Sequence, residues 1–124
     1  MKIIIPTETK SQDAPVCPSF GRAPIYAIYD TEGEAYEFLE NIAADSSSGA
    51  GIKAAQIVAD SGADALITYR CGENAANILE TAKVKIYKAQ QGTIAEHVAM
   101  YIDEELPLLT ESHPGFHNGG RRGR

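Results

Sequence analysis

The feature that most constrains the fold is an alternation of two apolar patterns in the second half of the chain. Residues 50–61, 75–82 and the segment after Thr93 place apolar side chains every three or four positions, as amphipathic helices do. Residues 65–69 and 84–87 lie between them and are short apolar segments typical of strands. Strands joined through a helix must run parallel, with right-handed crossovers. We therefore expect a parallel sheet flanked by helices.

The first half predicts a hairpin beside that sheet. Residues 2–6 form an apolar strand that ends at a proline. Residues 25–30 and 35–39 are rich in strand formers and flank a short turn, in which Gly33 can supply a positive φ. The predicted order is βββαβαβα, an α/β fold with a five-stranded mixed sheet. Strands one, four and five would form its parallel part.

The helix ends carry recognisable signals. Ser47 or Ser48 can cap the first helix, and Gly62 suits its end. Thr93 and Glu96 have the spacing of a capping box. The period predicts inner faces made by Ile52, Ala55, Val58 and Ala59 on the first helix and by Ile94, Val98, Tyr101 and Ile102 on the third, with His97 at the surface.

Composition limits the class of protein. A chain of 124 residues, 44% of them hydrophobic, fits one domain, which we expect over residues 1–103, followed by a flexible tail, acidic and then basic, over residues 104–124. Residues 1–111 hold 8 basic and 17 acidic residues, a net charge of −9 that disfavours nucleic acid. No apolar run approaches the roughly 20 residues of a membrane span. We expect a cytoplasmic protein.

The predicted topology gathers several loops at one edge of the sheet. Four strands would end there, and ligands of open α/β sheets bind beyond the carboxyl ends of the strands. Three helix N-termini would also lie there, each preceded by glycine: Gly49 and Gly51, Gly72, and Gly92. Helix N-termini favour anions, and glycines let a ligand approach backbone N–H groups. Each glycine alone could equally serve a turn. Together they predict an anion-binding crevice.

Both cysteines fall on the same edge. Cys71 directly precedes a helix N-terminus, which would lower its pKa, and Cys17 lies in a long loop near Arg22. Two thiolates could bind a soft metal, although Cys71 could equally be a small buried apolar residue. His113 and His117 add two imidazoles in the tail, which could chelate a metal if that segment folds back.

Other common chemistries do not fit the residues. Cys17 and Arg22 are one position too close for a phosphatase loop, and Arg22 leads into a strand instead of a helix. No nucleotide-binding glycine motif is present. Asp30, Asp60 and Asp64 are expected at turns and at the opposite edge, so they do not form a metal-dependent nuclease site.

Four separated motifs carry a resemblance to a known family. Phe20-Gly21-Arg22 precedes an aromatic strand, Gly49-Ala50-Gly51 opens a helix, Cys71-Gly72 is followed by Asn74, and Gly92 precedes the last helix. In this order they resemble the dinitrogenase iron–molybdenum cofactor biosynthesis family, over about residues 1–103. That family includes nitrogenase-cofactor carriers and orange proteins, which hold a molybdenum–copper sulfide cluster. The resemblance implies a ribonuclease-H-like fold.

The resemblance also implies a function. It points to a small non-enzymatic protein that binds or carries a metal–sulfur cluster of Fe–Mo or Mo–Cu type. We expect a cofactor-assembly protein or ATPase as its partner. We also expect the protein to be a monomer or a weak homodimer. The cluster-binding residues would be Ser19, Phe20, Gly21, Arg22, Gly49, Ala50, Gly51, Gly72, Asn74 and Gly92. Family carriers often have His where this chain has Ser19. We expect Cys17 and Cys71 to supply the soft ligands instead.

Two other functions stay open from the residues alone. Cys71 beside Arg70 could act as the nucleophile of a thiol-dependent enzyme on a small anion. Alternatively, the chain could be an interaction module without metal, whose partner recognises residues 112–124. A depressed thiol pKa with metal-free turnover would indicate the first, and loss of partner binding on deleting the tail would indicate the second.

Overall fold

The computed structural model describes residues 1–46 and 48–109. Its elements are, in chain order, β1 (Lys2–Thr7), β2 (Ile25–Asp30), β3 (Ala35–Glu40), the short 3-10 helix η1 (Ile42–Asp45), α1 (Ala50–Asp60), β4 (Ala65–Thr68), α2 (Glu73–Thr81), β5 (Lys85–Lys88) and α3 (Ile94–Ile102). The predicted order of strands and helices is confirmed, with η1 added. Among the described residues, no helix has the length and apolar character needed to cross a membrane.

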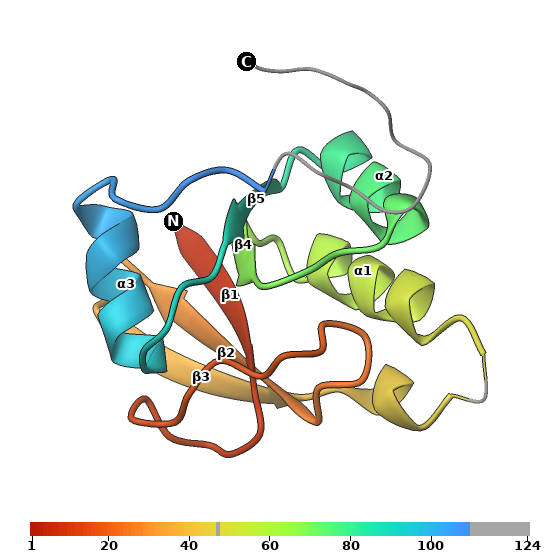
Figure 1. The fold of residues 1–124 in the computed structure, drawn as a ribbon, viewed down its shortest axis with the longest axis horizontal. Coiled ribbons are helices and arrows are strands. Elements are labelled where there is room, and N and C mark those ends of the chain that lie inside the picture. Colours follow the sequence, from red (N-terminus) through yellow and green to blue (C-terminus); the bar gives the residue numbers. More distant parts are fainter. Residues whose placement is uncertain (47, 110–124) are drawn as a thin grey trace.

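The strands form one mixed sheet in the order β3-β2-β1-β4-β5 (Figure 1). β1 pairs parallel with β4, and β4 pairs parallel with β5. The β2–β3 hairpin is antiparallel and joins the sheet through β1, with Ile4 opposite Ile28. This is the predicted mixed sheet. β1, β3, β4 and β5 therefore all end at the same edge.

Helices cover both faces of the sheet because its central strand is apolar on both sides. Ile3, Ile4 and Ile5 of β1 are all fully buried. Ile4 packs with Leu66 in the core under α1 and α2, whereas Ile3 and Ile5 belong to the core under α3. Figure 1 shows α1 and α2 on one side of the sheet and α3 on the other. Only α1 and α2 can thus share a crevice.

The start of α1 differs from the prediction, whereas its end and the start of α3 agree with it. Gly49 is the N-cap, in the left-handed conformation (φ 70°), so Ser48 does not cap the helix, and Ser47 lies outside the described residues. Gly62 follows the helix with φ 79° and ends it as expected. The capping box at α3 is present.

Two further local predictions differ from the structure. In the β2–β3 turn Glu34 adopts the positive φ (53°), and Gly33 does not. On α1, Ala55 and Val58 are buried as predicted, but Ile52 is 45% exposed and Ala59 only partly buried. Ala50 and Ala54 are buried instead, so the inner face is rotated from the expected one.

The inner face of α3 contains a polar residue that the pattern placed outside. His97 is fully buried beside Ile94 and Val98, whereas Ile102 is 54% exposed. The ring nitrogen Nε2 of His97 accepts a hydrogen bond from the Gln90 N–H (2.9 Å), and Nδ1 lies 2.8 Å from the Thr93 carbonyl oxygen. Hydrogen bonding at both ring nitrogens explains why an imidazole is tolerated in this core.

Part of the expected tail lies along the sheet. The Lys88 N–H donates to the carbonyl of Pro107, the Leu109 N–H donates to that of Ile86, and Leu106 is buried. Residues 106–109 therefore cover the outer edge of β5. A domain boundary after residue 103 stays a prediction.

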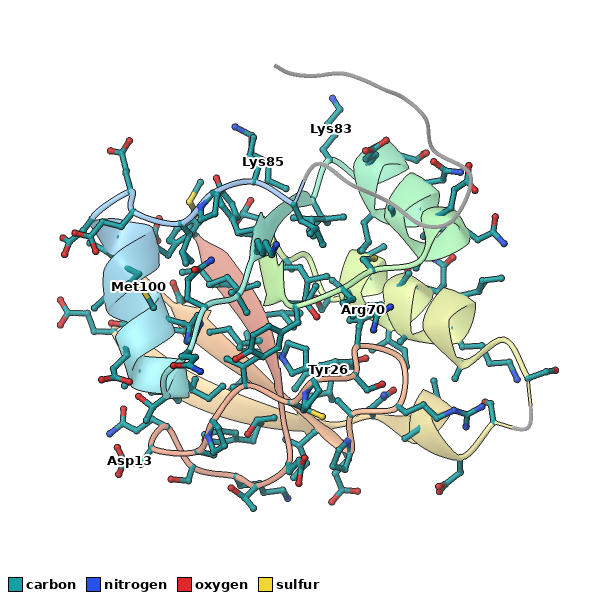
Figure 2. All side chains as sticks on the ribbon, in the orientation of Figure 1. Asp13, Tyr26, Arg70, Lys83, Lys85 and Met100 are labelled. Carbon is teal, nitrogen blue, oxygen red and sulfur yellow. The ribbon has the colours of Figure 1, made fainter. Side chains whose placement is uncertain are left out.

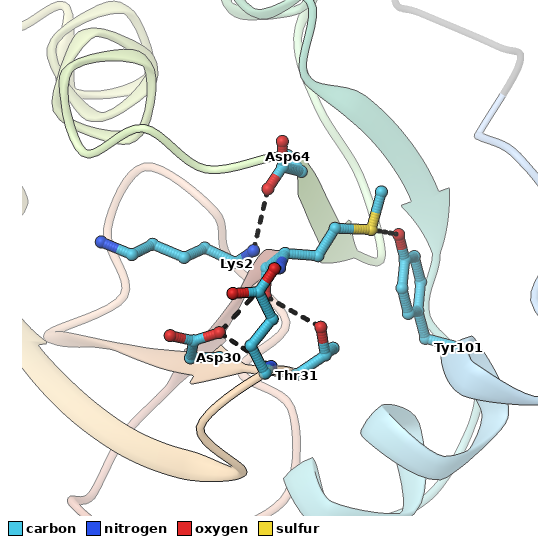
Figure 3. Close-up of polar contacts among 7 residues, drawn as sticks. Lys2, Asp30, Thr31, Asp64 and Tyr101 are labelled. Atoms are coloured by element: carbon cyan, nitrogen blue, oxygen red, sulfur yellow. Dashed lines mark hydrogen bonds and ion pairs between the residues drawn. The ribbon is translucent and has the colours of Figure 1, made fainter.

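Polar contacts gather at the end of the sheet where β1 begins (Figure 3). The Lys2 N–H donates to a carboxylate oxygen of Asp64 (2.9 Å), and the Thr31 hydroxyl donates to the Met1 carbonyl (3.4 Å). The Asp30 carboxylate lies 3.9 Å from the Met1 nitrogen. These acids belong to turns at the edge away from the carboxyl ends of the parallel strands, as expected.

Candidate functional site

One cleft of about 690 Å³ lies beyond the carboxyl ends of β1 and β4. Three segments surround it: the loop after β1, the first turn of α1, and the β4–α2 connection with the start of α2. Its lining residues are Pro18, Ser19, Phe20, Gly21, Arg22, Gly49, Ala50, Gly51, Ile52, Arg70, Cys71, Gly72, Glu73, Asn74 and Ala75. Nine of the ten predicted cluster-binding residues line it, and Cys71 does too. Their role in binding stays a prediction.

The loop and α1 meet through two glycines. A Cβ added to Gly21 would lie 2.8 Å from the backbone nitrogen of Gly51 and 2.9 Å from its Cα. Such distances are well inside van der Waals contact, so only glycine at position 21 permits this approach. The 19–22 turn is therefore seated directly on the first turn of α1.

Unlike Gly21, Gly51 and Gly72 are not required to be glycine by the backbone. Gly51 is helical, and Gly72 has an ordinary extended conformation (φ −66°, ψ 161°). A Cβ on either would meet no atom within 4 Å. Glycine in a helix is less stable than alanine by up to about 1 kcal/mol. Both positions thus keep the cleft wall free of side chains, at Gly51 against the helical preference for alanine and at Gly72 in an N-cap position that Ser, Asn or Asp would cap better.

Backbone N–H groups at this wall have no acceptor in the described part of the chain. The first helical hydrogen bond of α1 runs from the Lys53 N–H to the Gly49 carbonyl, and that of α2 from Ala76 to Gly72. The first-turn N–H groups of α1, from Ala50 to Ile52, have no acceptor among the residues that the structure describes. Together with the helix dipole they give the cleft a positive potential.

Two arginines add charge. Arg22 is held in place: its Nη1 donates to the carbonyls of Ala44 (2.9 Å) and Ser46 (2.7 Å), and its backbone N–H donates to the Ser19 hydroxyl oxygen (3.0 Å). Arg70 is exposed at the end of β4, and Figure 2 shows its side chain on the side of the sheet that α1 covers. Glu73 is the only acidic residue among the lining residues. The cleft is suited to an anion.

The third helix N-terminus does not contribute, so the expected convergence of three is wrong. Gly92 lies outside the cleft lining. The Ile94 and Ala95 N–H groups donate to the carbonyls of Ala14 and Gln12 (both 2.9 Å), and the capping box uses those of Thr93 and Glu96. The loop after β1 therefore closes the N-terminus of α3.

The cysteines differ from the prediction in place and in chemistry. Cys17 is buried, and it is absent from the cleft lining. Its N–H donates to the Pro6 carbonyl, which draws the loop back onto β1. Cys71 lines the cleft but is only 3% exposed. Burial raises the pKa of both thiols, that of Cys71 to about 11. The expected lowering by the helix N-terminus is wrong.

The described residues contain no group of three or more His, Cys, Asp or Glu side chains that could hold a metal ion. His113 and His117 lie outside the described residues. A single thiol at the cleft is too few protein ligands to enclose a metal centre. Within the described part of the chain, a bound metal species would depend mainly on N–H groups and arginines.

Sequence reasoning missed Asn41 and the role of Ser19 at this site, and it considered Arg70 only as the neighbour of a nucleophilic Cys71. Ser19 caps the turn that carries Arg22. Asn41 caps η1 by accepting from the Ala43 N–H, and it also contacts the 19–23 backbone. An Asn before a short apolar helical segment is a recognisable N-cap signal. Its second set of contacts depends on tertiary structure and has no local signal.

The glycine positions predict opposite changes in stability. Gly21→Ala should lower the free energy of unfolding by about 1 to 3 kcal/mol, because its Cβ would collide with the Gly51 backbone. Gly51→Ala should raise it by up to about 1 kcal/mol, because alanine is favoured in helices and its Cβ meets nothing. Urea unfolding checks both. Equal changes in the two variants would contradict the close approach.

The raised pKa of Cys71 predicts a pH-dependent stability. The folded protein keeps the thiol protonated between its ordinary pKa of 9.0 and about 11, whereas the unfolded chain loses the proton. In a Cys17→Ser background the free energy of unfolding should fall as the pH rises across this window. Adding Cys71→Ala should remove that part of the fall. If the two proteins differ in their free energy of unfolding by the same amount at every pH, the pKa of Cys71 is not raised.

Comparisons with known proteins agree with this architecture. The sequence model of the dinitrogenase iron-molybdenum cofactor family matches residues 1–104. The apo orange protein from Desulfovibrio gigas is 31% identical, with a TM-score of 0.85 over 91% of this chain and 96% of that one. A Thermotoga protein described as a candidate NifB protein is 33% identical, with a TM-score of 0.79 over 93% and 98%. An uncharacterized protein of Methanocaldococcus jannaschii is 28% identical over 109 residues, which cover 86% of this chain and 89% of that protein. The chain belongs to the dinitrogenase iron-molybdenum cofactor family.

Proposed function

We propose that this protein binds an anionic metal–sulfur cluster in the cleft and carries it during cofactor assembly, without catalysing a reaction. The observation that carries the proposal is the bare wall at Gly51 and Gly72, two positions where glycine has no backbone requirement. A side chain there would keep a bulky ligand away from the helix N-termini. The wall is explained if a ligand lies against it.

The chemistry of the cleft fits such a cargo. Sulfide ligands give these clusters a negative charge. Backbone N–H groups and guanidinium groups can stabilise it by donating hydrogen bonds to the sulfur atoms. Arg22 is fixed by its two carbonyl contacts, and Arg70 has an exposed guanidinium at the same cleft. We infer that these groups hold the cluster, with Cys71 as the only thiol in reach.

The relatives suggest the kind of cluster. The family is named for the iron–molybdenum cofactor, and one similar structure is an orange protein. We propose a cluster of Fe–Mo or Mo–Cu type in a ribonuclease-H-like fold, in a cytoplasmic protein that is a monomer or weak homodimer. A cofactor-assembly protein or ATPase would supply or receive the cluster.

The thiol-enzyme alternative has less support. A nucleophilic cysteine needs a thiolate near neutral pH, and burial raises the pKa of Cys71 to about 11. We propose no catalytic role for it.

Titration of the apo protein with tetrathiomolybdate, alone and mixed with copper(I), tests the proposal. Calorimetry and visible absorption, both without oxygen, should show stoichiometric binding. Gly51→Ala and Arg70→Ala should each weaken binding about tenfold or more. The added Cβ of Gly51→Ala would keep the ligand away from the N–H groups of α1, and Arg70→Ala removes a charged donor. Cys71→Ser should stay within about threefold of the parent.

Gly33→Ala is the matched control, because Gly33 lies in the β2–β3 turn, has no positive φ and leaves room for a Cβ. It should bind as the parent does. Molybdate and sulfate serve as anion controls for simple charge attraction. Absence of binding by the parent, or binding lost in Cys71→Ser and unchanged in Gly51→Ala, would refute the proposed mode.

A further inference from the structure

Asn41 joins one of the segments that form the cleft, the loop after β1, to the neighbouring helix η1. It lies between β3 and η1 and is only 5% exposed. Its Nδ2 lies 3.0 Å from the Gly21 carbonyl oxygen and 2.8 Å from that of Ala23, and its Oδ1 accepts from the Ala43 N–H (3.0 Å). One side chain thus holds both the loop after β1 and the first turn of η1.

Arg22 closes the network from the other side. Its guanidinium donates to the carbonyls of Ala44 and Ser46, at the end of the segment that Asn41 caps. The amide of Asn41 therefore reaches from η1 to the loop, and the guanidinium of Arg22 reaches from the loop back to η1. Each anchor limits the movement of the other segment.

A buried tyrosine completes the arrangement. The Tyr26 hydroxyl donates to the Phe20 carbonyl (2.6 Å) and lies 3.2 Å from Nδ2 of Asn41. The rings of Phe20 and Tyr26 are 5.8 Å apart. Figure 2 labels Tyr26 at this loop. Three successive residues of the turn are thus held: Phe20 by the Tyr26 hydroxyl, Gly21 by the Asn41 amide, and Arg22 by carbonyls at the end of η1.

We propose that Asn41 is a positioning residue for the cleft: it sets the seat of Gly21 on Gly51 and the place of the Arg22 guanidinium. This inference rests on the proposed function, because it assigns the residue that prepares that binding site. Asn41 does not line the cleft and would not touch the ligand. Its effect on affinity would be indirect, through preorganisation of the donors.

The residue type matters because both ends of the amide are used. Serine could cap η1 through its hydroxyl oxygen but could not donate to two carbonyls at this distance. Aspartate would cap η1 but would place a carboxylate against the same carbonyls. Only a carboxamide supplies the acceptor and the paired donors together. Asn41→Ser therefore separates positioning from capping.

The test combines a measurement with ligand and one without. In Asn41→Ser, the Kd for tetrathiomolybdate should rise about tenfold or more relative to the parent, at a temperature where both proteins are folded. Without ligand, the amide NMR signals of Gly21, Arg22 and Gly51 should shift, whereas that of Gly72, at the start of α2, should not. Tyr26→Phe should change both readouts in the same direction by a smaller factor and serves if Asn41→Ser does not fold.

Ile94→Val is the stability control, because Ile94 is fully buried in the core on the other face of the sheet. It should lower Tm and leave the Kd unchanged. If a folded Asn41→Ser or Tyr26→Phe protein has the parent Kd and unshifted Gly21 and Gly51 signals, Asn41 is only structural and the inference is wrong. If the parent binds no thiomolybdate, the proposed function fails, and the ligand-free NMR comparison still decides whether Asn41 positions the cleft.

Discussion

The cleft depends on the approach of Gly21 to Gly51. Backbone can meet backbone there because Gly21 has no side chain: a Cβ on it would lie 2.8 Å from the Gly51 nitrogen. The contact seats the 19–22 turn beside the first turn of α1. It thereby places Arg22 next to N–H groups that have no acceptor in the described structure. Hydrogen bonds from Asn41 and Tyr26 hold the turn in this seat.

The loop after β1 also explains why α3, unlike α1, does not present its N-terminus to the cleft. Its first part gives the carbonyls of Gln12 and Ala14 to the start of α3, which is closed in this way. Its second part lines the cleft beside α1 and α2. The central position of β1, buried on both faces, makes this division possible, because the loop leaves the sheet between the two helix layers.

Features with local causes could be predicted from the sequence. The order of elements along the chain and the parallel part of the sheet follow from apolar segments separated by helical ones, and the capping box of Thr93 and Glu96 depends on residues three positions apart. Gly92, Cys17 and His97 were misplaced because their surroundings depend on the path of the loop after β1 and on core packing. No local pattern shows which N–H group a distant carbonyl will reach. The double role of Asn41 was hidden for the same reason.

The central claim is that the cluster is held against the two bare helix starts by N–H groups and arginines. A crystal of the protein loaded with a thiomolybdate–copper cluster, measured at the molybdenum absorption edge, would locate the metal directly. We predict an anomalous peak in the cleft, with sulfur atoms within hydrogen-bond distance of first-turn N–H groups of α1 and of Arg70. A peak outside the cleft, or a metal bound by both cysteine sulfurs after rearrangement of the loop, would contradict this account.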